Sequence, residues 1–542
     1  MDDVRRKKEI MAMKRKYPVG IQSFETIRKD GYLYIDKTAL VYKMITEGKP
    51  YFLSRPRRFG KSLLISTLQA VFEGRRDLFE AFTTEQGIHQ PQLYIAQTDW
   101  KWEKHPVLRF DFSKCVEYTL EGLKDQIRNT LSQYETKYGV KAEMADNSIR
   151  LEHIILAAHQ QTGKRVVVLV DEYDTVMLHN LGDTAKERAI RECVLGTFGL
   201  LKAMDDHLQF VLLTGISKFS QMGIFSRLNN LMNISMQTTY DSLCGISEEE
   251  LATQLRPDIE SLAQTNGLSY DEQMAELKNM YDGYHFSRRM TDLYNPFSLM
   301  NALQLEDVGS YWFDRGTSSA LIEMLAQMPS VDVASIESSI YPSTMFDLPF
   351  ESFDDPLPIL YQSGYLTIKG YERSIDGYQL GVPNNEVRRG FAECLYKHIV
   401  GKGNDLSRGV FYQAYDKFRR DSNLPAFIEA LKAFFASLPY PWEKDNRNEH
   451  YYHSLLYTLL TAFGADVRAE EPTAKGQSDL VLLMPKGIYI MELKYNDTAD
   501  TALAQIDAKG YADKYALDGR PVTKIGIAFS TDERNISEWK SR

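Results

Sequence analysis

Cysteine is scarce in this sequence, and long apolar runs are missing. The 542 residues include four cysteines, Cys115, Cys193, Cys244 and Cys394, and no two of them form a C-x-x-C pair. This distribution excludes a disulfide framework and the usual zinc-site spacing, and it is typical of a reducing cytoplasm. The apolar runs are too short to span a membrane, and the charged N-terminal segment lacks the apolar core of a signal peptide. We therefore expect a cytoplasmic protein with no membrane partner.

The sequence also lacks an excess of positive charge. Its 64 Lys and Arg residues face 74 Asp and Glu residues, so the formal net charge is −10. This balance argues against a surface that coats nucleic acid non-specifically, although a local basic groove remains compatible with it. The composition, 43% hydrophobic and 25% charged, is that of an ordinary globular protein. A chain of 542 residues is too long for one core, so we expect two to four domains.

A candidate phosphate-binding loop lies in the segment YFLSRPRRFGKSLL, residues 51–64. Gly60-Lys61-Ser62 matches the end of the G-x-x-x-x-G-K-[ST] pattern, but Arg55 stands where that pattern has its first glycine. A short apolar run precedes the loop, and residues with helical spacing follow it, which is the order that phosphate binding at a helix N-terminus requires. The alternative is a basic helix start with a chance GKS. The predicted ATP contacts are Arg57, Arg58, Phe59, Gly60, Lys61, Ser62 and Leu63.

A buried strand followed by acids supports the same site. Residues 165–174, RVVVLVDEYD, have the pattern of a parallel strand that ends at a site, and they match a Walker B motif. We expect Asp171, with Ser62, to hold Mg²⁺, and Glu172 to orient or deprotonate the attacking water. The alternative is a core strand capped by solvated acids. The next strand ends at Thr214, which is placed to sense the γ-phosphate of ATP.

The pattern around these motifs predicts the fold of the N-terminal part. A further strand fits residues 105–113, and helices fit near 119–138, 150–161 and 184–205. Alternating strands and helices indicate an α/β nucleotide-binding domain with a P-loop of the ASCE or AAA-like type. We assign this domain to residues 1–240.

Several stretches together resemble a known family. PVGIQSFETIRKDGYLYIDKT, RPRRFGKS, VLVDEYD and LLTGISKFSQMGIFSRLNNL are similar to the AAA-ATPase-like family of bacterial proteins, which carries a PD-(D/E)XK nuclease-like domain at its C-terminus. In that family RPRRFGKS is the usual form of the loop, so the resemblance implies that Arg55 is normal there. Arg227 is either an arginine finger acting in trans or a solvated arginine, and we favour the second. A homo-oligomer through the ATPase domain is kept open.

The middle of the chain is expected to be mainly helical. From residue 241 we expect no more strands, and Ser247 with Glu250 predicts a capping box that opens a helix. Further helices are expected near 271–282, 296–305 and 317–327. We assign residues 241–345 to a helical lid, in which His285 packs rather than catalyses.

Residues 346–400 have a different pattern. A short helix leads into a strand, a turn at Asp376-Gly377 and a returning strand that enters another helix. Helix, hairpin and helix suggest a winged-helix-like module, and the family resemblance implies the same. Arg388 and Arg389 are its notable basic pair, so we favour a packing role over DNA binding. Residues 401–440 are expected to form a helical connector.

A second candidate site lies in the sequence GQSDLVLLMPKGIYIMELKY. Two strands joined by a turn carry Asp479 on the first and Glu492 with Lys494 on the second, the D-x(n)-E-x-K arrangement of restriction-endonuclease-like folds. The two carboxylates are suited to hold Mg²⁺ against a scissile phosphate. Lys494 shares a strand face with Glu492, where it would orient or deprotonate water or stabilise phosphate charge.

The flanking elements agree with that fold. A helix from Glu449, three strands, a helix at 500–518 and a strand at 524–529 give the order αβββαβ, which we assign to residues 441–542. Glu449 resembles the acidic residue that such nucleases often place on the first helix as a further metal ligand. Gln505 matches a glutamine that many relatives keep, whereas Tyr511 does not match their Q-x-x-x-Y spacing.

Two functional hypotheses follow. The first is an ATPase whose nucleotide cycle controls a Mg²⁺-dependent nuclease acting on nucleic acid, with DNA expected over RNA. The second is a nucleotide-dependent switch whose degenerate nuclease-fold domain binds nucleic acid or protein. The net charge of −10 favours the second hypothesis or a localised, gated groove in the first.

Overall fold

The computed structural model describes residues 15–48, 50–141, 146–180, 183–217, 230–312, 336, 339–347, 357–400, 405–437, 449–473 and 475–542. The chain divides into two compact units. The first contains Met1–Met324 and Tyr341–Glu386, and the second contains Leu325–Ile340 and Val387–Arg542. The finer domain boundaries expected from the sequence remain predictions. Within the described residues, no helix is both long and apolar enough to cross a membrane.

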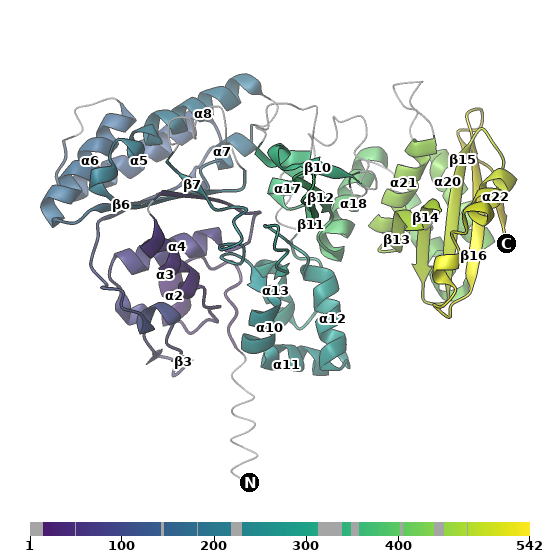
Figure 1. Ribbon diagram of the computed structural model, residues 1–542, viewed down its shortest axis with the longest axis horizontal. Coiled ribbons are helices and arrows are strands. Elements are labelled where there is room, and N and C mark those ends of the chain that lie inside the picture. The colour runs from purple at the N-terminus through teal and green to yellow at the C-terminus, as the bar shows by residue number, and fades with distance from the viewer. Residues whose placement is uncertain are drawn as a thin grey trace, which may run out of the picture. The chain divides into compact units, whose positions relative to one another are not determined.

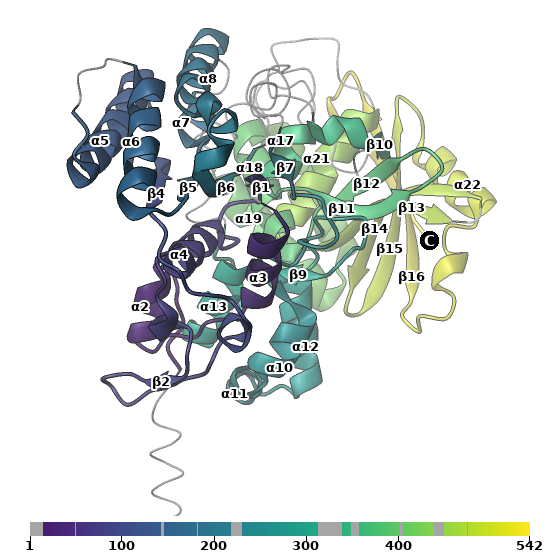
Figure 2. The ribbon, with the colours of Figure 1, turned by 60° about the vertical axis from the view of Figure 1, so that its left-hand side comes forward.

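The first unit is built on a parallel five-stranded sheet of order β4-β5-β6-β1-β7. Its strands are β1 (Pro50–Ser54), β4 (Val107–Asp111), β5 (Val166–Asp171), β6 (Leu208–Gly215) and β7 (Met232–Asn233). Figures 1 and 2 show one group of helices on each face. One group is α5 (Leu120–Tyr138), α6 (Asn147–Thr162), α7 (Thr175–Leu178) and α8 (Thr184–Phe198), and the other is α2 (Phe24–Lys29), α3 (Thr38–Glu47) and α4 (Lys61–Phe72). The alternating α/β fold predicted for this region is therefore present.

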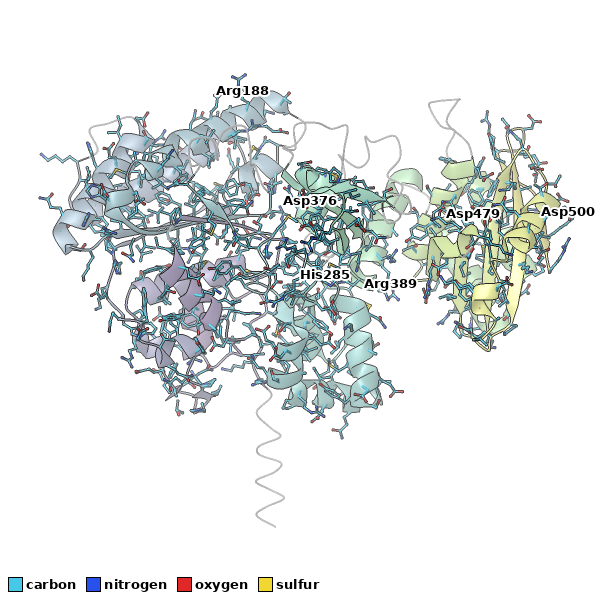
Figure 3. All side chains as sticks on the ribbon, in the orientation of Figure 1. Arg188, His285, Asp376, Arg389, Asp479 and Asp500 are labelled. Carbon is cyan, nitrogen blue, oxygen red and sulfur yellow. The ribbon has the colours of Figure 1, made fainter. Side chains whose placement is uncertain are left out.

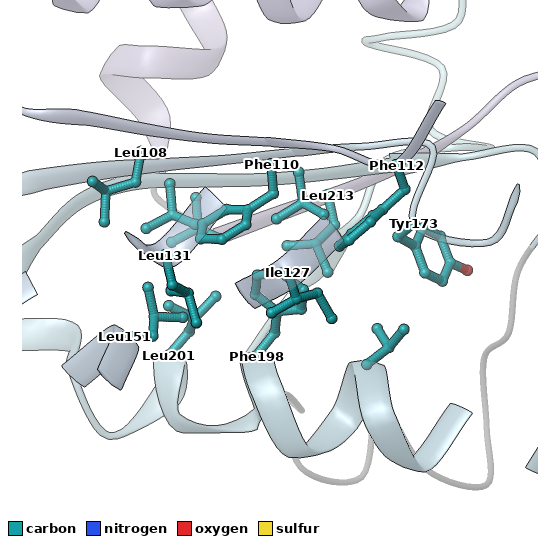
Figure 4. Packing of buried hydrophobic residues seen from close by; sticks show 14 of the residues in the cluster. Leu108, Phe110, Phe112, Ile127, Leu131, Leu151, Tyr173, Phe198, Leu201 and Leu213 are labelled. Carbon is teal, nitrogen blue, oxygen red and sulfur yellow. The ribbon is translucent and has the colours of Figure 1, made fainter. Parts of the chain in front are cut away.

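The core of this unit lies between the sheet and the helices α5, α6 and α8 (Figure 4). Leu108 and Phe110 stand two residues apart on β4 and point to the same face of the sheet, because side chains alternate along a strand. They pack with Ile127 and Leu131 of α5 and with Phe198 of α8. All five side chains are fully buried or nearly so, which fixes the register of β4 and holds the ends of the strands in place.

The segment from residue 246 to 305 forms a helical layer with one small strand pair. Its helices are α10 (Glu248–Gln254), α11 (Arg256–Asn266), α12 (Tyr270–Tyr281) and α13 (Pro296–Leu305). The predicted capping box at Ser247 and Glu250 is confirmed. The expectation that strands end at 241 is wrong, because β8 (Ile246–Ser247) pairs with β9 (Leu293–Tyr294), two-residue strands too short to leave a periodic signal. The helix α11 was not predicted, and the helix expected at 317–327 lies outside the described residues.

A helix, a hairpin and a second helix follow. They are α17 (Leu357–Ser363), β11 (Thr367–Glu372), β12 (Gly377–Gly381) and α18 (Asn385–Val400), with β10 (Ile340–Pro342) beside β12. Asp376 sits in the hairpin turn with a left-handed φ of 46°, a conformation that Asp tolerates better than most residues. The order of elements is the one expected, and the winged-helix assignment itself remains a prediction. A small hairpin of β2 (Phe82–Thr83) and β3 (His89–Gln90) completes the first unit.

The second unit contains a five-stranded mixed sheet of order β13-β14-β15-β16-β17. The strands are β13 (Asp466–Thr473), β14 (Gly476–Met484), β15 (Gly487–Tyr495), β16 (Val522–Ser530) and β17 (Asn535–Ser541), and its helices are α19 (Asp405–Asp421), α20 (Leu424–Ser437), α21 (Glu449–Ala462) and α22 (Ala499–Lys509). The pair β15 and β16 is parallel, because α22 crosses between these strands, and the other pairs are antiparallel.

Two details of this unit differ from the sequence prediction. The strand β17 adds to the expected αβββαβ order, and it was missed because NISEWKS has few apolar residues. The helix expected at 500–518 ends at Lys509, where Gly510 takes a left-handed φ of 62° and caps it.

Candidate functional site

The candidate phosphate loop lies between β1 and α4. Gly60 has a φ of 94°, a left-handed conformation that favours glycine, and α4 begins at the next residue. The buried Lys61 ammonium donates to the carbonyl oxygens of Arg55 and Pro56, both at 2.9 Å. Burial lowers the pKa of Lys61, and the charges of Glu172 and Asp171 oppose that shift. The loop thus holds a cation at its centre, close to the acids of β5.

Arg55 points into the protein interior. Its side chain is 1% exposed, its guanidinium packs 4.2 Å from the centre of the Phe286 ring, and it donates to four backbone carbonyls. Those carbonyls belong to Ser54, Ser235, Tyr240 and Asp241. The arginine in place of the usual glycine is therefore an internal support of the loop, since its two terminal nitrogens donate to backbone oxygens.

The order of the sheet brings the acids of β5 to the same place. The strand β6 lies between β1 and β5, and the hydroxyl of Thr214 at its end donates to Asp171 Oδ1 over 2.7 Å. Glu172 has a left-handed φ of 52° and accepts from the Thr175 hydroxyl at 3.1 Å. Burial raises the pKa of Glu172, and the nearby Lys61 charge partly offsets this. The residues predicted from three separate motifs thus meet at one edge of the sheet.

A cavity of about 520 Å³ opens beside the loop. Residues 57–64 and Glu172 lie at one end of it, and mainly apolar side chains, with Gln22, Lys37 and Thr67 among them, line the rest. Arg58 stacks on the Phe297 ring, with its guanidinium carbon 4.0 Å from the ring centre. The apolar lining was not anticipated, because it comes from segments far apart in the chain: Val19, Ile21, Tyr34, Phe297 and Met300.

The second candidate site lies on β14 and β15, where Figure 3 labels Asp479. Asp479 Oδ2 accepts from the backbone N–H of Leu493 at 2.7 Å, and the Asp479 N–H reaches Glu492 Oε2 at 3.5 Å. The Lys494 ammonium lies 3.4 Å from Glu492 Oε1 and 3.3 Å from Glu449 Oε1. Asp479, Glu492, Lys494 and Glu449 are therefore brought together, with Glu449 joined to the others through Lys494.

The electrostatics of this group favour a bound cation. Burial, and then the charge of Asp479, raises the pKa of Glu492 to about 8, and burial also raises the pKa of Asp479. Burial disfavours the charged Lys494, but the charges of Glu492 and Glu449 together raise its pKa. Asp479 and Glu492 are neighbouring carboxylates, the oxygen ligands that a hard divalent cation such as Mg²⁺ prefers, while Glu449 is linked to them through Lys494.

His453 is a residue of this site that the sequence analysis missed. Its Nε2 lies 2.8 Å from the carbonyl oxygen of Asp479, so it ties α21 to β14 at the acid itself. The available signal was its position four residues after Glu449, which places both on one helix face. Tyr511 is buried beside Gln505; burial and the nearby charges of Glu492 and Asp479 raise its pKa.

Comparison with known proteins identifies the family of each of two regions of the chain. Residues 18–225 match a family model described as a predicted AAA-ATPase, and residues 447–539 match the PD-(D/E)XK nuclease superfamily. The chain is also 34% identical over 537 residues to an uncharacterized protein in the vnfD 5′ region of Azotobacter chroococcum mcd 1. The aligned residues make up 96% of this chain and 98% of that protein. The chain belongs to the AAA-ATPase-like family with a C-terminal PD-(D/E)XK domain.

This AAA-ATPase-like protein has a second buried acid after β5. Asp174 is 0% exposed, and its Oδ2 accepts from the N–H groups of Ile216 and Ser217 at 2.9 and 2.6 Å and from the Ser217 hydroxyl at 2.6 Å. It therefore fixes the chain that follows β6 to the turn that carries Glu172. The sequence signal for Asp174 was its position as the last acid of the DEYD segment. Arg227, further along, lies outside the described residues.

A cluster of three acids in the helical layer is paired with a lysine of the same layer. Oxygen atoms of Glu248, Asp282 and Asp292 lie within 4.8 Å of one another. The Lys278 ammonium lies 2.7 Å from Glu248 and 3.2 Å from Asp292, and His285 Nε2 is 2.6 Å from Asp292. We interpret this group as an ion-pair network that joins α10, α12 and the β9 segment, which agrees with the packing role expected for His285.

Replacing Arg55 by glycine restores the general P-loop pattern, and we expect it to harm the protein. Arg55→Gly leaves four buried carbonyls without their donor, which should lower the free energy of unfolding of the first unit by about 3 kcal/mol. Arg188→Ala, at an exposed arginine of α8, should change it by less than about 0.5 kcal/mol. Urea unfolding and calorimetric ATP titration measure both effects. Unchanged stability, or ATP affinity that rises several-fold, would show that Arg55 obstructs the loop.

The raised pKa of Glu492 predicts a pH-dependent stability of the metal-free protein. Between about pH 4.5 and 8, folded Glu492 holds a proton that the unfolded chain has released, so its contribution to stability is full below pH 4.5 and is lost as the pH rises toward 8. Glu492→Gln mimics the protonated acid, so its stability relative to the parent should increase across this range by on the order of 2–4 kcal/mol.

Urea unfolding in EDTA across this pH range tests the prediction. Glu429→Gln, at an exposed acid of α20, is the control and should follow the parent at every pH. Parallel curves for the parent and Glu492→Gln would contradict the raised pKa.

Proposed function

We propose that this protein binds and hydrolyses ATP and that its nucleotide cycle controls a Mg²⁺-dependent nuclease domain that acts on nucleic acid, DNA in preference to RNA. The observation that carries the proposal is that each unit brings together side chains suited to phosphate chemistry. In the first unit, Lys61, Asp171 and Thr214 meet at the ends of three neighbouring strands. In the second, Asp479, Glu492 and Lys494 meet on two paired strands.

In the proposed ATP site, each residue has a distinct task. The Lys61 ammonium, which donates to two loop carbonyls, would exchange these for phosphate oxygens. Ser62 and Asp171 would hold Mg²⁺, with Thr214 orienting the Asp171 carboxylate. Glu172 would accept a proton from the attacking water. The apolar part of the cavity supports a site for the adenine base, because it offers flat and flexible apolar side chains beside the loop.

In the proposed nuclease site, the chain supplies metal ligands and one cation. Asp479, Glu492 and Glu449 would hold Mg²⁺, which when bound lowers the pKa of water and neutralises charge on the scissile phosphate. Lys494 would orient the attacking water or contact the phosphate. The N–H of Leu493 holds the Asp479 carboxylate in place, so the acid is positioned before the metal arrives.

The surroundings of Asp479 support a nucleic-acid substrate. Lys475 and Lys509 are exposed near the start of β14, and Lys509 Cδ would lie 3.6 Å from a Cβ added at Gly476, three residues before Asp479. In the part of the chain that the structure describes, neither lysine has an ion-pair partner. Uncompensated cations beside a metal-binding acid attract a phosphate backbone.

A chain of contacts supports control of one site by the other. The Trp312 indole donates to the carbonyl of Arg57 in the phosphate loop at 3.4 Å, and Arg58 donates to the carbonyl of Tyr311 at 3.2 Å. The N–H groups of Tyr311 and Trp312 donate to Glu386 in the first turn of α18. The helix α18 continues into the second unit. A change in the phosphate loop on nucleotide binding therefore has a covalent route to the second unit.

The ATP site predicts different defects for two variants. Lys61→Ala should lower ATP affinity at least tenfold, because the phosphate-contacting ammonium is lost. Glu172→Gln should keep ATP binding but reduce turnover at least a hundredfold, because the water loses its carboxylate partner. Calorimetric titration and a phosphate-release assay measure these quantities, with Lys186→Ala on α8 as a control that leaves both unchanged. Parental ATP affinity in Lys61→Ala would reject the ATP site.

The nuclease site predicts a separation between cleavage and metal binding. Lys494→Ala should reduce cleavage of DNA about a hundredfold or more while metal binding and ATP turnover persist, because the carboxylate ligands remain. Asp479→Ala should weaken metal binding as well. Lys486→Ala, in the turn between β14 and β15, is the matched control and should cut like the parent.

Cleavage is measured with Mg²⁺ and Mn²⁺ on single-stranded DNA, duplex DNA and RNA, and metal binding by titration calorimetry. A parent that cuts, with an equally active Lys494→Ala variant, would show that this lysine is structural. A parent that binds metal but cuts nothing would favour the alternative, a nuclease-fold domain used only for binding.

A further inference from the structure

A second cavity of the first unit lies apart from the ATP site. It is a shallow groove of about 770 Å³ that α3, the segment 238–239, the turn at 288–289 and the β11–β12 hairpin line together. Figure 3 labels His285, which precedes the turn, and Asp376, in the turn of the hairpin. The lining residues share no member with the ATP cavity, so the groove is a separate feature.

The groove is strongly basic. Of the eight described residues that line it, four are cationic, Lys43, Arg288, Arg289 and Arg373, and none is a carboxylate, although the whole chain has a net charge of −10. All four are exposed, and over the described residues Arg289 and Arg373 have no ion-pair partner. Lys43 lies 3.6 Å from the exposed Glu47 carboxylate, and Asp376 beside the groove partly balances Arg288. Two arginines thus remain without a counter-ion.

The groove is held in shape by buried hydrogen bonds. The Asp241 carboxylate accepts from the hydroxyls of Ser287 and Thr291, both at 2.9 Å. These two hydrogen bonds hold both ends of the turn that carries Arg288 and Arg289. Thr367 of β11 accepts from the His285 N–H at 2.7 Å, so the hairpin is tied to the same turn. The positive charges are therefore presented on a fixed framework, which lowers the entropic cost of binding an extended anion.

The lining also offers groups that suit a nucleic-acid strand. The partly exposed Tyr371 provides an aromatic ring among the arginines, and the Thr238 and Thr239 hydroxyls can donate to phosphate oxygens. Arginines that follow a backbone, interleaved with an aromatic ring for base stacking, are the features by which proteins bind single strands without sequence preference.

From these observations we infer that the groove binds a single DNA strand, with Arg289 and Arg373 contacting its phosphates. The inference rests on the proposed function only in the choice of nucleic acid as the anion, since it places a strand-binding surface on the ATPase unit rather than at the nuclease site. It explains how an acidic protein engages a nucleic acid, because positive charge is concentrated where the strand lies.

The test measures binding without cleavage. Fluorescence anisotropy of labelled oligothymidylate is recorded in EDTA with the full-length parent, the double variant Arg289→Glu/Arg373→Glu, and the control Arg128→Glu/Arg188→Glu, which makes the same charge change on α5 and α8. The groove variant should bind the oligonucleotide at least tenfold more weakly than the parent. The slope of its log Kd against log salt concentration should be smaller than that of the parent by about 1.4, because two phosphate contacts are lost. The control should stay within about threefold of the parent.

Three outcomes would overturn the inference. They are a parent that does not bind the oligonucleotide, a control that loses as much affinity as the groove variant, and equal or tighter groove-dependent binding of duplex DNA or RNA. Unchanged ATP turnover in the groove variant shows that it is folded. The Asp479→Ala variant, measured in the same binding assay, separates the two proposals. If this variant still binds the strand while the parent shows no cleavage, the groove is supported and the nuclease proposal is rejected.

Discussion

The hydrogen bond from Thr214 to Asp171 is the interaction on which the first site depends. It forms because β6 lies between β1 and β5, so that the ends of all three parallel strands meet at one edge of the sheet. Asp174 extends the same arrangement by holding the chain after β6 to the turn that carries Glu172. Lys61 then faces these acids from the start of α4. The position of each functional group thus follows from strand order and from the packing that fixes strand register.

The second unit reaches a similar result with different elements. There, β14 and β15 pair side by side, and the Leu493 N–H holds Asp479 next to Glu492. Burial raises the pKa of both carboxylates, and a divalent cation bound beside them would favour their charged forms. Both sites therefore use acids held in place by backbone or hydroxyl donors.

The parts that the sequence could predict were those with a local signal. The order strand, GKS and helix, the capping box at Ser247, and the acids of β14 and β15 each lie within about twenty residues of one another. The use of Arg55 could not be read from the sequence, because three of its carbonyl partners lie about 180 residues further along the chain. The apolar cavity lining and the basic groove were missed for the same reason, since they exist only where distant segments meet, whereas His453 had a local signal in its spacing from Glu449. The strand β17 was missed because its apolar pattern is weak.

We propose that nucleotide binding in the first unit controls phosphodiester cleavage in the second. The direct measurement is the initial rate of Mg²⁺-dependent DNA cleavage by the full-length protein, with and without ATP, for the parent, Lys61→Ala and Glu172→Gln. We expect ATP to change the rate of the parent at least tenfold. With ATP present, Glu172→Gln should keep the rate of the ATP-bound state, and Lys61→Ala should keep the nucleotide-free rate whether or not ATP is added. Equal rates with and without ATP in a parent whose cleavage requires Asp479 would contradict it.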